Sequence, residues 1–123
     1  MESKLVSGLF FAGEVIDVDG YTDGTFGKAS YGTFMEADEA LADAAVKFGI
    51  PRKQAVVFAA QTLKGAAAMV LETGEHPEAL KDAVCSPGGS TIVGVEELEN
   101  GAFRGTVANA VVSAYEKTKK LGE

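Results

Sequence analysis

The sequence predicts a mainly α-helical fold with a small β strand or hairpin at its N-terminus. Glycine interrupts a β-rich apolar run over residues 1–34, whereas alanine, leucine, glutamate and valine recur at helical spacing from about Met35 onward. With 123 residues and 46% hydrophobic residues, the chain has the size and composition of one globular domain. We therefore expect a glycine-rich β segment over residues 1–34 and an all-helical region over residues 35–123.

The β segment is expected where apolar and acidic residues mix, in Gly8-Leu9-Phe10-Phe11-Ala12-Gly13-Glu14-Val15-Ile16-Asp17-Val18-Asp19. The apolar stretch after Met1 is short and is interrupted by Ser7, Gly8 and Gly13. It fits neither a signal peptide nor a membrane span, so a soluble chain is expected.

Glycine and proline divide the helical region. The first helix is expected from about Ser30 to Phe48, ending at Gly49, and Pro51 fits the first turn of a second helix that runs to about Thr73. A short helix follows from His76-Pro77 through Val84, where Glu78 complements the helix dipole. Further helices are expected to about Asn100 and over residues 102–121, where the final lysines suit a helix C-terminus.

The second helix is apolar on nearly every side. Its apolar runs are Ala55-Val56-Val57-Phe58-Ala59-Ala60 and Ala66-Ala67-Ala68-Met69-Val70-Leu71. Gln61, Thr62 and Lys64 interrupt the helix, which argues against a lipid bilayer and for burial inside protein. A chain of this size has few other helices to enclose it, so we expect a second copy to do so, in a homodimer or a higher oligomer. Phe48, Phe58 and Met69 are expected in the core.

Charge and cysteine content exclude several classes of function. The chain has 11 Lys and Arg against 18 Asp and Glu, a net charge of -7 that disfavours a nucleic-acid partner. One cysteine, Cys85, excludes an intrachain disulfide framework and indicates a reducing, cytoplasmic compartment.

Metal and nucleophile sites are weighed against simpler interpretations. Cys85 and His76 are too few for a Cys/His zinc site, and a buried structural cysteine is commoner than a nucleophile paired with a histidine. Asp17, Asp19 and Asp23 resemble the start of a calcium loop, but Ser30 stands where that loop needs its bidentate glutamate. A solvated acidic turn is the simpler interpretation, and no metal site is expected.

The segment whose chemistry exceeds packing is Ser86-Pro87-Gly88-Gly89-Ser90-Thr91. Gly88 and Gly89 let the backbone approach a ligand, and the N–H groups of the helix that follows can bind a carboxylate or a phosphate. The candidate binding residues are Ser86, Gly88, Gly89, Ser90 and Thr91. The alternative is a plain turn in which Ser90 or Thr91 is the helix N-cap.

Residues 39–121 resemble the C-terminal dimerisation domain of pyrroline-5-carboxylate reductase. The motifs that carry this resemblance are Gly49-Ile50-Pro51-Arg52, Ala59-Ala60-Gln61-Thr62, Glu72-Thr73-Gly74-Glu75-His76-Pro77, Leu80-Lys81-Asp82, Ser86-Pro87-Gly88-Gly89-Ser90-Thr91 and Gly101-Ala102-Phe103-Arg104. The resemblance implies a helical dimerisation fold like the C-terminal domain of 6-phosphogluconate dehydrogenase, with two copies interlocked through long helices.

For the site, the resemblance implies that residues 86–91 hold the substrate carboxylate on backbone N–H groups, with the Thr91 hydroxyl near the ring nitrogen as the candidate catalytic group. It also implies proline biosynthesis, with NAD(P)H bound by a separate Rossmann domain. Gly20, Gly24 and Gly27 do not form G-x-G-x-x-G, so no cofactor is expected here. We expect an oligomerisation module that binds a small cyclic amino acid weakly and is inactive alone; the alternative is a reductase fragment that takes its cofactor from another chain.

Residues 8–22 are similar to a segment of FAD-binding flavoproteins related to aminoacetone oxidase. Two resemblances in one small chain suggest a chimera, in which an engineered or borrowed β segment precedes the helical module. A flavin-binding module is a third interpretation, although the segment lacks the nucleotide-binding core of those proteins, so FAD is not expected as a cofactor.

Overall fold

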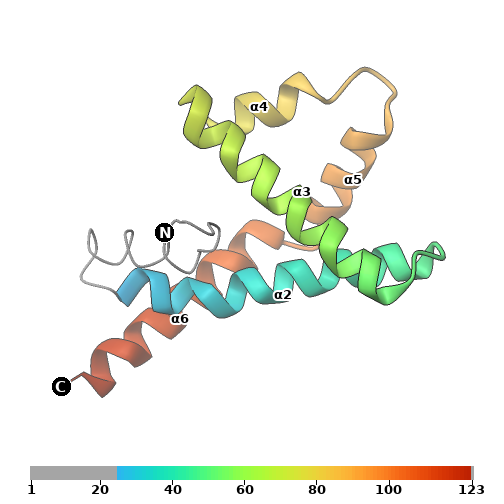
Figure 1. The fold of residues 1–123 in the computed structure, drawn as a ribbon. Helices are drawn as coiled ribbons and strands as arrows, with labels where there is room; N and C mark the ends of the chain where they lie inside the picture. Colours follow the sequence, from blue (N-terminus) through green and yellow to red (C-terminus); the bar gives the residue numbers. More distant parts are fainter. Residues whose placement is uncertain (1–24, 123) are drawn as a thin grey trace. The chain divides into compact units, whose positions relative to one another are not determined.

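The computed structural model describes residues 25–122, and the helices there are α2 (Thr25–Lys47), α3 (Arg52–Thr73), α4 (Pro77–Ala83), α5 (Ser90–Asn100) and α6 (Phe103–Leu121) (Figure 1). The mainly helical prediction is confirmed over this range, in which no residue forms a strand. The strand or hairpin expected over residues 8–19 and the acidic residues Asp17, Asp19 and Asp23 lie outside the described residues.

The first described helix begins earlier than the sequence predicts. Residues 25–34, assigned to the β segment, are helical, because α2 starts at Thr25 and not at about Ser30. The Ser30 hydroxyl donates to the Phe26 carbonyl at 2.8 Å, a bond that a serine can make inside a helix. Gly27 and Gly32 cost the helix only about 1 kcal/mol each. The glycines that suggested a β segment are therefore tolerated inside a helix here.

The described residues fall into two compact units, which we treat separately: residues 25–35 with 105–122, and Glu36–Arg104. In the first unit Ala29 is buried at the start of α2. Near the end of α6 the Lys119 ammonium lies 5.9 Å from the centre of the Tyr115 ring. Lys119 and Lys120 occupy the last turn of α6, where the helix dipole favours cations, as predicted.

In the second unit the end of α2 packs against the start of α3 through small side chains. Ala42, Ala55 and Ala59 are buried there, with relative exposures of 1%, 0% and 6%. Gly49, at φ 99, lies in the turn between the two helices, as the sequence predicts. Arg52 at the start of α3 pairs with Asp43 of α2 at 2.7 Å and with Glu39 at 3.8 Å. We call this region, residues 39–59, the α2–α3 corner.

After α3, the chain turns at Gly74, a left-handed C-cap whose N–H donates to the Val70 carbonyl. His76 is the N-cap of α4, because its Nδ1 accepts a hydrogen bond of 3.1 Å from the Glu78 N–H. Pro77 and Glu78 occupy the first turn, as predicted. A loop joins α4 to α5, and the two helices extend from it in different directions (Figure 1). We call residues 77–100 the α4–α5 arm, and neither of its helices contains a buried residue.

Candidate functional site

The loop between α4 and α5 adopts one tight geometry. Gly88 has φ 74, a left-handed conformation that favours glycine. The Gly89 N–H donates to the Ser86 carbonyl at 3.0 Å. A Cβ added to Gly89 would lie 2.5 Å from the Ser86 Oγ and 3.2 Å from the Ser86 carbonyl oxygen. A larger residue at Gly89 would therefore force the Ser86 hydroxyl to rotate away and the Ser86 carbonyl to shift by a few tenths of an ångström.

The loop leads directly into the start of α5. The N-cap is Gly89, and no side chain makes a capping hydrogen bond to the first turn. Ser90 and Thr91 are the first two residues of the helix, so the alternative in which one of them is the N-cap is wrong. Gly89 takes that position because its extended backbone, at φ -83 and ψ 177, is the conformation that an N-cap needs.

The structure brings together the residues that the sequence singled out. Ser86, Gly88, Ser90 and Thr91 are exposed, and Gly89 is half-buried. The N–H groups of the first turn of α5 have no intrahelical acceptor and can donate to an anion. The exposed Ser90 and Thr91 hydroxyls start the same helix and can each donate or accept. Donors of this kind suit a carboxylate, and the binding of one at this loop stays a prediction.

Cys85 and His76 do not form a catalytic pair in the structure. His76 uses its Nδ1 as the N-cap of α4, and half-buried Cys85 follows the other end of that helix. Among residues 25–122 no group of His, Cys, Asp and Glu is arranged to hold a metal ion.

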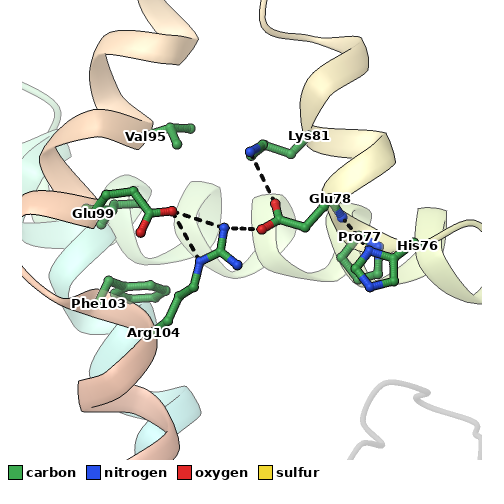
Figure 2. Close-up of a pocket in the computed structure, with 9 residues that line it drawn as sticks. His76, Pro77, Glu78, Lys81, Val95, Glu99, Phe103 and Arg104 are labelled. Carbon is green, nitrogen blue, oxygen red and sulfur yellow. Dashed lines mark hydrogen bonds and ion pairs between the residues drawn. The ribbon is translucent and has the colours of Figure 1, made fainter.

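A second polar cluster lies along an open groove of about 430 Å³ between the start of α4 and the α5–α6 turn. Figure 2 shows the Arg104 side chain reaching between Glu99 of α5 and Glu78 of α4. Its Nη2 pairs with Glu78 Oε2, and with Glu99 Oε2 at 3.0 Å. Its Nε also donates to Glu99 Oε2, at 3.2 Å. The groove is lined further by Val95, Leu98 and Phe103.

The carboxylate of Glu78 is engaged on both oxygens. Oε1 pairs with the Lys81 ammonium at 3.2 Å, and Oε2 pairs with Arg104. Hydrogen bonds from Lys81 and then Arg104 lower the pKa of Glu78 below its usual 4.5. The acids in turn raise the pKa of Lys81, through Asp82 first, and of Arg104, through Glu78 first. With these pKa shifts, Glu78, Lys81 and Arg104 stay charged at neutral pH.

Sequence reasoning missed this cluster. Glu78 was assigned to the helix dipole alone, and Arg104 appeared only as part of a motif. Spacing along the chain shows the pairs Glu78–Lys81 and Glu99–Arg104, which are three and five residues apart. It does not show the contact between Glu78 and Arg104, which depends on the path of the chain between them.

Large apolar side chains on α3 are uncovered in one copy. Ala55 and Ala59 are the buried residues of this helix. Val57, Phe58, Met69 and Leu71 are 51–83% exposed, and Phe48 before the helix is 85% exposed. Phe48, Phe58 and Met69, which were expected in the core, are therefore not buried within one copy. Within residues 25–122 too few other helices pack on α3 to cover it. The apolar sequence of α3 predicts this lack of covering helices in one copy.

By length and composition α3 is also apolar enough to cross a membrane. Its most apolar window has a mean hydropathy of 1.3 and is 11% buried. A helix that a protein partner covers meets the same description, so the expectation of no membrane partner stays a prediction.

Comparison with known proteins gives a consistent result. The family model of pyrroline-5-carboxylate reductase dimerisation matches residues 27–121. Pyrroline-5-carboxylate reductase of Escherichia coli is 59% identical over 85 residues, which are 69% of this chain and 32% of that protein. A crystal structure of the Plasmodium falciparum reductase with NADP bound superposes with a TM-score of 0.74 and 36% identity, over 85% of this chain and 40% of that one.

One relative bears on the N-terminal segment. Pyrroline-5-carboxylate reductase 2 of Rattus norvegicus is 45% identical over 120 residues, which are 96% of this chain and 37% of that protein. This match takes in most of residues 1–34, whereas the flavoprotein resemblance over residues 8–22 and the chimera hypothesis find no support among these similarities. The chain spans about a third of the length of the curated relatives it matches.

Proposed function

Since the chain belongs to the pyrroline-5-carboxylate reductase dimerisation family, we propose that it is the self-associating part of such a reductase and that its α4–α5 loop binds the carboxylate of a proline-like substrate. The observation that carries the proposal is α3, a helix of 22 residues of which one copy buries Ala55 and Ala59. A second copy packed on the exposed apolar residues of α3 removes them from water.

The loop supports the second half of the proposal. It presents an uncapped helix start beside the Ser90 and Thr91 hydroxyls, and Gly88 and Gly89 leave the backbone accessible. We propose that the substrate carboxylate accepts from the N–H groups of this turn, and that the Thr91 hydroxyl hydrogen-bonds the ring nitrogen. Residues 25–122 form no strand and hence no βαβ unit for a dinucleotide. We propose that the whole enzyme, of which this chain is a part, catalyses the reduction, because its relatives are named pyrroline-5-carboxylate reductase.

We further propose that residues 1–34 belong to this reductase and not to a flavoprotein. The match of the rat relative over 96% of the chain supports this assignment, and so does the start of the family match at residue 27. A flavin spectrum in the purified protein would contradict it.

Sedimentation of the chain over a range of concentrations tests self-association. We expect a dimer or larger species, and we expect Ala67→Asp to shift it toward single copies, because Ala67 lies among the exposed apolar residues of α3. Gln54→Asp is the matched control: it adds the same charge at an exposed polar position of the same helix and should leave the assembly unchanged. Folded single copies at every concentration, or insertion of α3 into lipid vesicles, would contradict the proposal.

Titration with L-proline tests the loop. Weak binding is expected, and Gly89→Ala should weaken it further, since the new methyl group would force the Ser86 side chain to rotate and the Ser86 carbonyl to shift. Gly94→Ala, five residues further along the chain and inside α5, has open space around its new Cβ and should bind as the unaltered chain does. Equal binding by both variants would show that proline does not use this loop.

A further inference from the structure

The Arg104 side chain joins two helices that otherwise diverge. Glu78 belongs to the first turn of α4 and Glu99 to the last turn of α5, so both acids lie at the ends of the arm away from the loop (Figure 2). Arg104 follows α5 after a short turn and pairs with both acids. One guanidinium thus spans the open end of the arm, opposite residues 84–89.

Within the described part of a single copy, no buried apolar side chains join α4 to α5 in place of the ion pairs of Arg104. Neither α4 nor α5 has a buried residue, and the groove between them and the start of α6 is open. The charges are well placed to hold the two helices, because the Glu78 carboxylate is fixed by Lys81 on its other oxygen. An arginine that pairs with two acids, one of them already fixed, loses less side-chain freedom per bond than an isolated surface pair does.

The loop at the closed end tolerates little change in the angle between the helices. Gly88 is held at φ 74, and Gly89 both donates to the Ser86 carbonyl and lies against the Ser86 side chain. The Val84 and Cys85 N–H groups donate to the Lys81 and Asp82 carbonyls, so the chain passes directly from the end of α4 into this turn. A change in the direction of α4 relative to α5 would therefore strain the turn and move the N–H groups at the start of α5. The geometry of residues 86–91 therefore depends on what fixes the open end.

We propose that Arg104 is a positioning residue: by tying α4 to the end of α5, it holds the Ser86–Thr91 loop in the shape that binds a carboxylate. This inference rests on the proposed function for its ligand, but the link between Arg104 and the loop can be measured without any ligand.

Amide hydrogen exchange of residues 84–92 in the intact chain is the direct test. Arg104→Gln should speed exchange by about threefold to fivefold, a modest factor because the ion pairs are half-exposed. Arg52→Gln is the matched control, since Arg52 also bridges two acids and is half-exposed, but it lies in the α2–α3 corner. It should leave exchange of this segment unchanged. Equal exchange in Arg104→Gln and Arg52→Gln would overturn the proposal.

A second variant keeps the test decisive if Arg104→Gln fails to fold. Glu78→Gln removes the contact that crosses the groove and should speed loop exchange to a similar extent, and the double variant should add little. Lys81→Met removes the other partner of Glu78 but leaves its contact with Arg104, so it should have a smaller effect. Additive effects of Glu78→Gln and Arg104→Gln would overturn the link.

L-Proline titration separates this inference from the proposed function. Arg104→Gln should raise the dissociation constant by about threefold to fivefold while sedimentation shows the same assembly. Arg104→Lys, which keeps the charge, should recover part of the loss. If the unaltered chain binds no proline, the proposed ligand is wrong, and faster loop exchange in Arg104→Gln still supports the positioning role.

Discussion

In each of two regions of the chain, one arginine pairs with two acidic residues. The two regions differ in whether buried apolar side chains pack next to these ion pairs. In the α2–α3 corner, Arg52 pairs with Asp43 and Glu39 above buried Ala42, Ala55 and Ala59. In the α4–α5 arm, Arg104 pairs with Glu78 and Glu99 beside helices that bury no residue. The corner is stabilised by apolar packing within one copy, whereas the arm depends on its charges and on what packs against it.

The largest effect is expected where the corner buries its smallest side chains. Ala55→Asp places a carboxylate at a position with 0% exposure and should cost about 3–5 kcal/mol of unfolding free energy. Denaturant unfolding with Gln54→Asp as the control measures it. A cost near that of the control would show that the corner is not packed as described.

A smaller effect is expected in the turn that leads to Arg104. Ala102 has φ 57, a left-handed conformation in which a side chain is strained, whereas the corner has Gly49 at its left-handed position. Ala102→Gly should therefore raise the unfolding free energy by about 0.5–1 kcal/mol. Ala108→Gly, inside α6, should lower it by a similar amount, as measured by thermal unfolding. A loss of stability in both variants would contradict the strained turn.

The smallest expected effect is the loss of stability at low pH that is due to Glu78. The pKa of Glu78 is lowered by Lys81 and Arg104, so its contribution to stability is complete above 4.5, its usual value, and is lost as the pH falls through the lower value in the folded chain. Unfolding of the unaltered chain and of Glu78→Gln from about pH 6 to about pH 3 should show a steeper loss in the unaltered chain. Parallel curves would show that Glu78 does not contribute.

The same contrast explains what the sequence could predict. Gly49, Pro51, Gly74 and Pro77 end or start helices through local backbone chemistry, so the boundaries near them were predicted closely. The start of α2 was missed, because Gly27 and Gly32 indicate a break that the helix tolerates. Residues 86–91 were identified because the binding chemistry lies in consecutive residues.

The contact between Arg104 and Glu78 joins residues that are distant in the sequence, and no local pattern shows it. The composition of α3 shows that the helix has more apolar residues than one copy can bury. It does not show which of these side chains stay exposed in one copy. Periodicity places Phe58 and Met69 on apolar faces, yet it does not say whether the covering atoms belong to the same molecule.

The uncovered length of α3 makes the fate of each polypeptide depend on its neighbour. A newly synthesised subunit has to associate with a second copy quickly. Otherwise its exposed apolar residues will bind unrelated proteins, and the subunit will be degraded. By the same logic, a subunit with a damaged α4–α5 arm can still recruit a sound one through α3. A cell that makes both forms would then hold mixed pairs, each with one damaged and one sound arm.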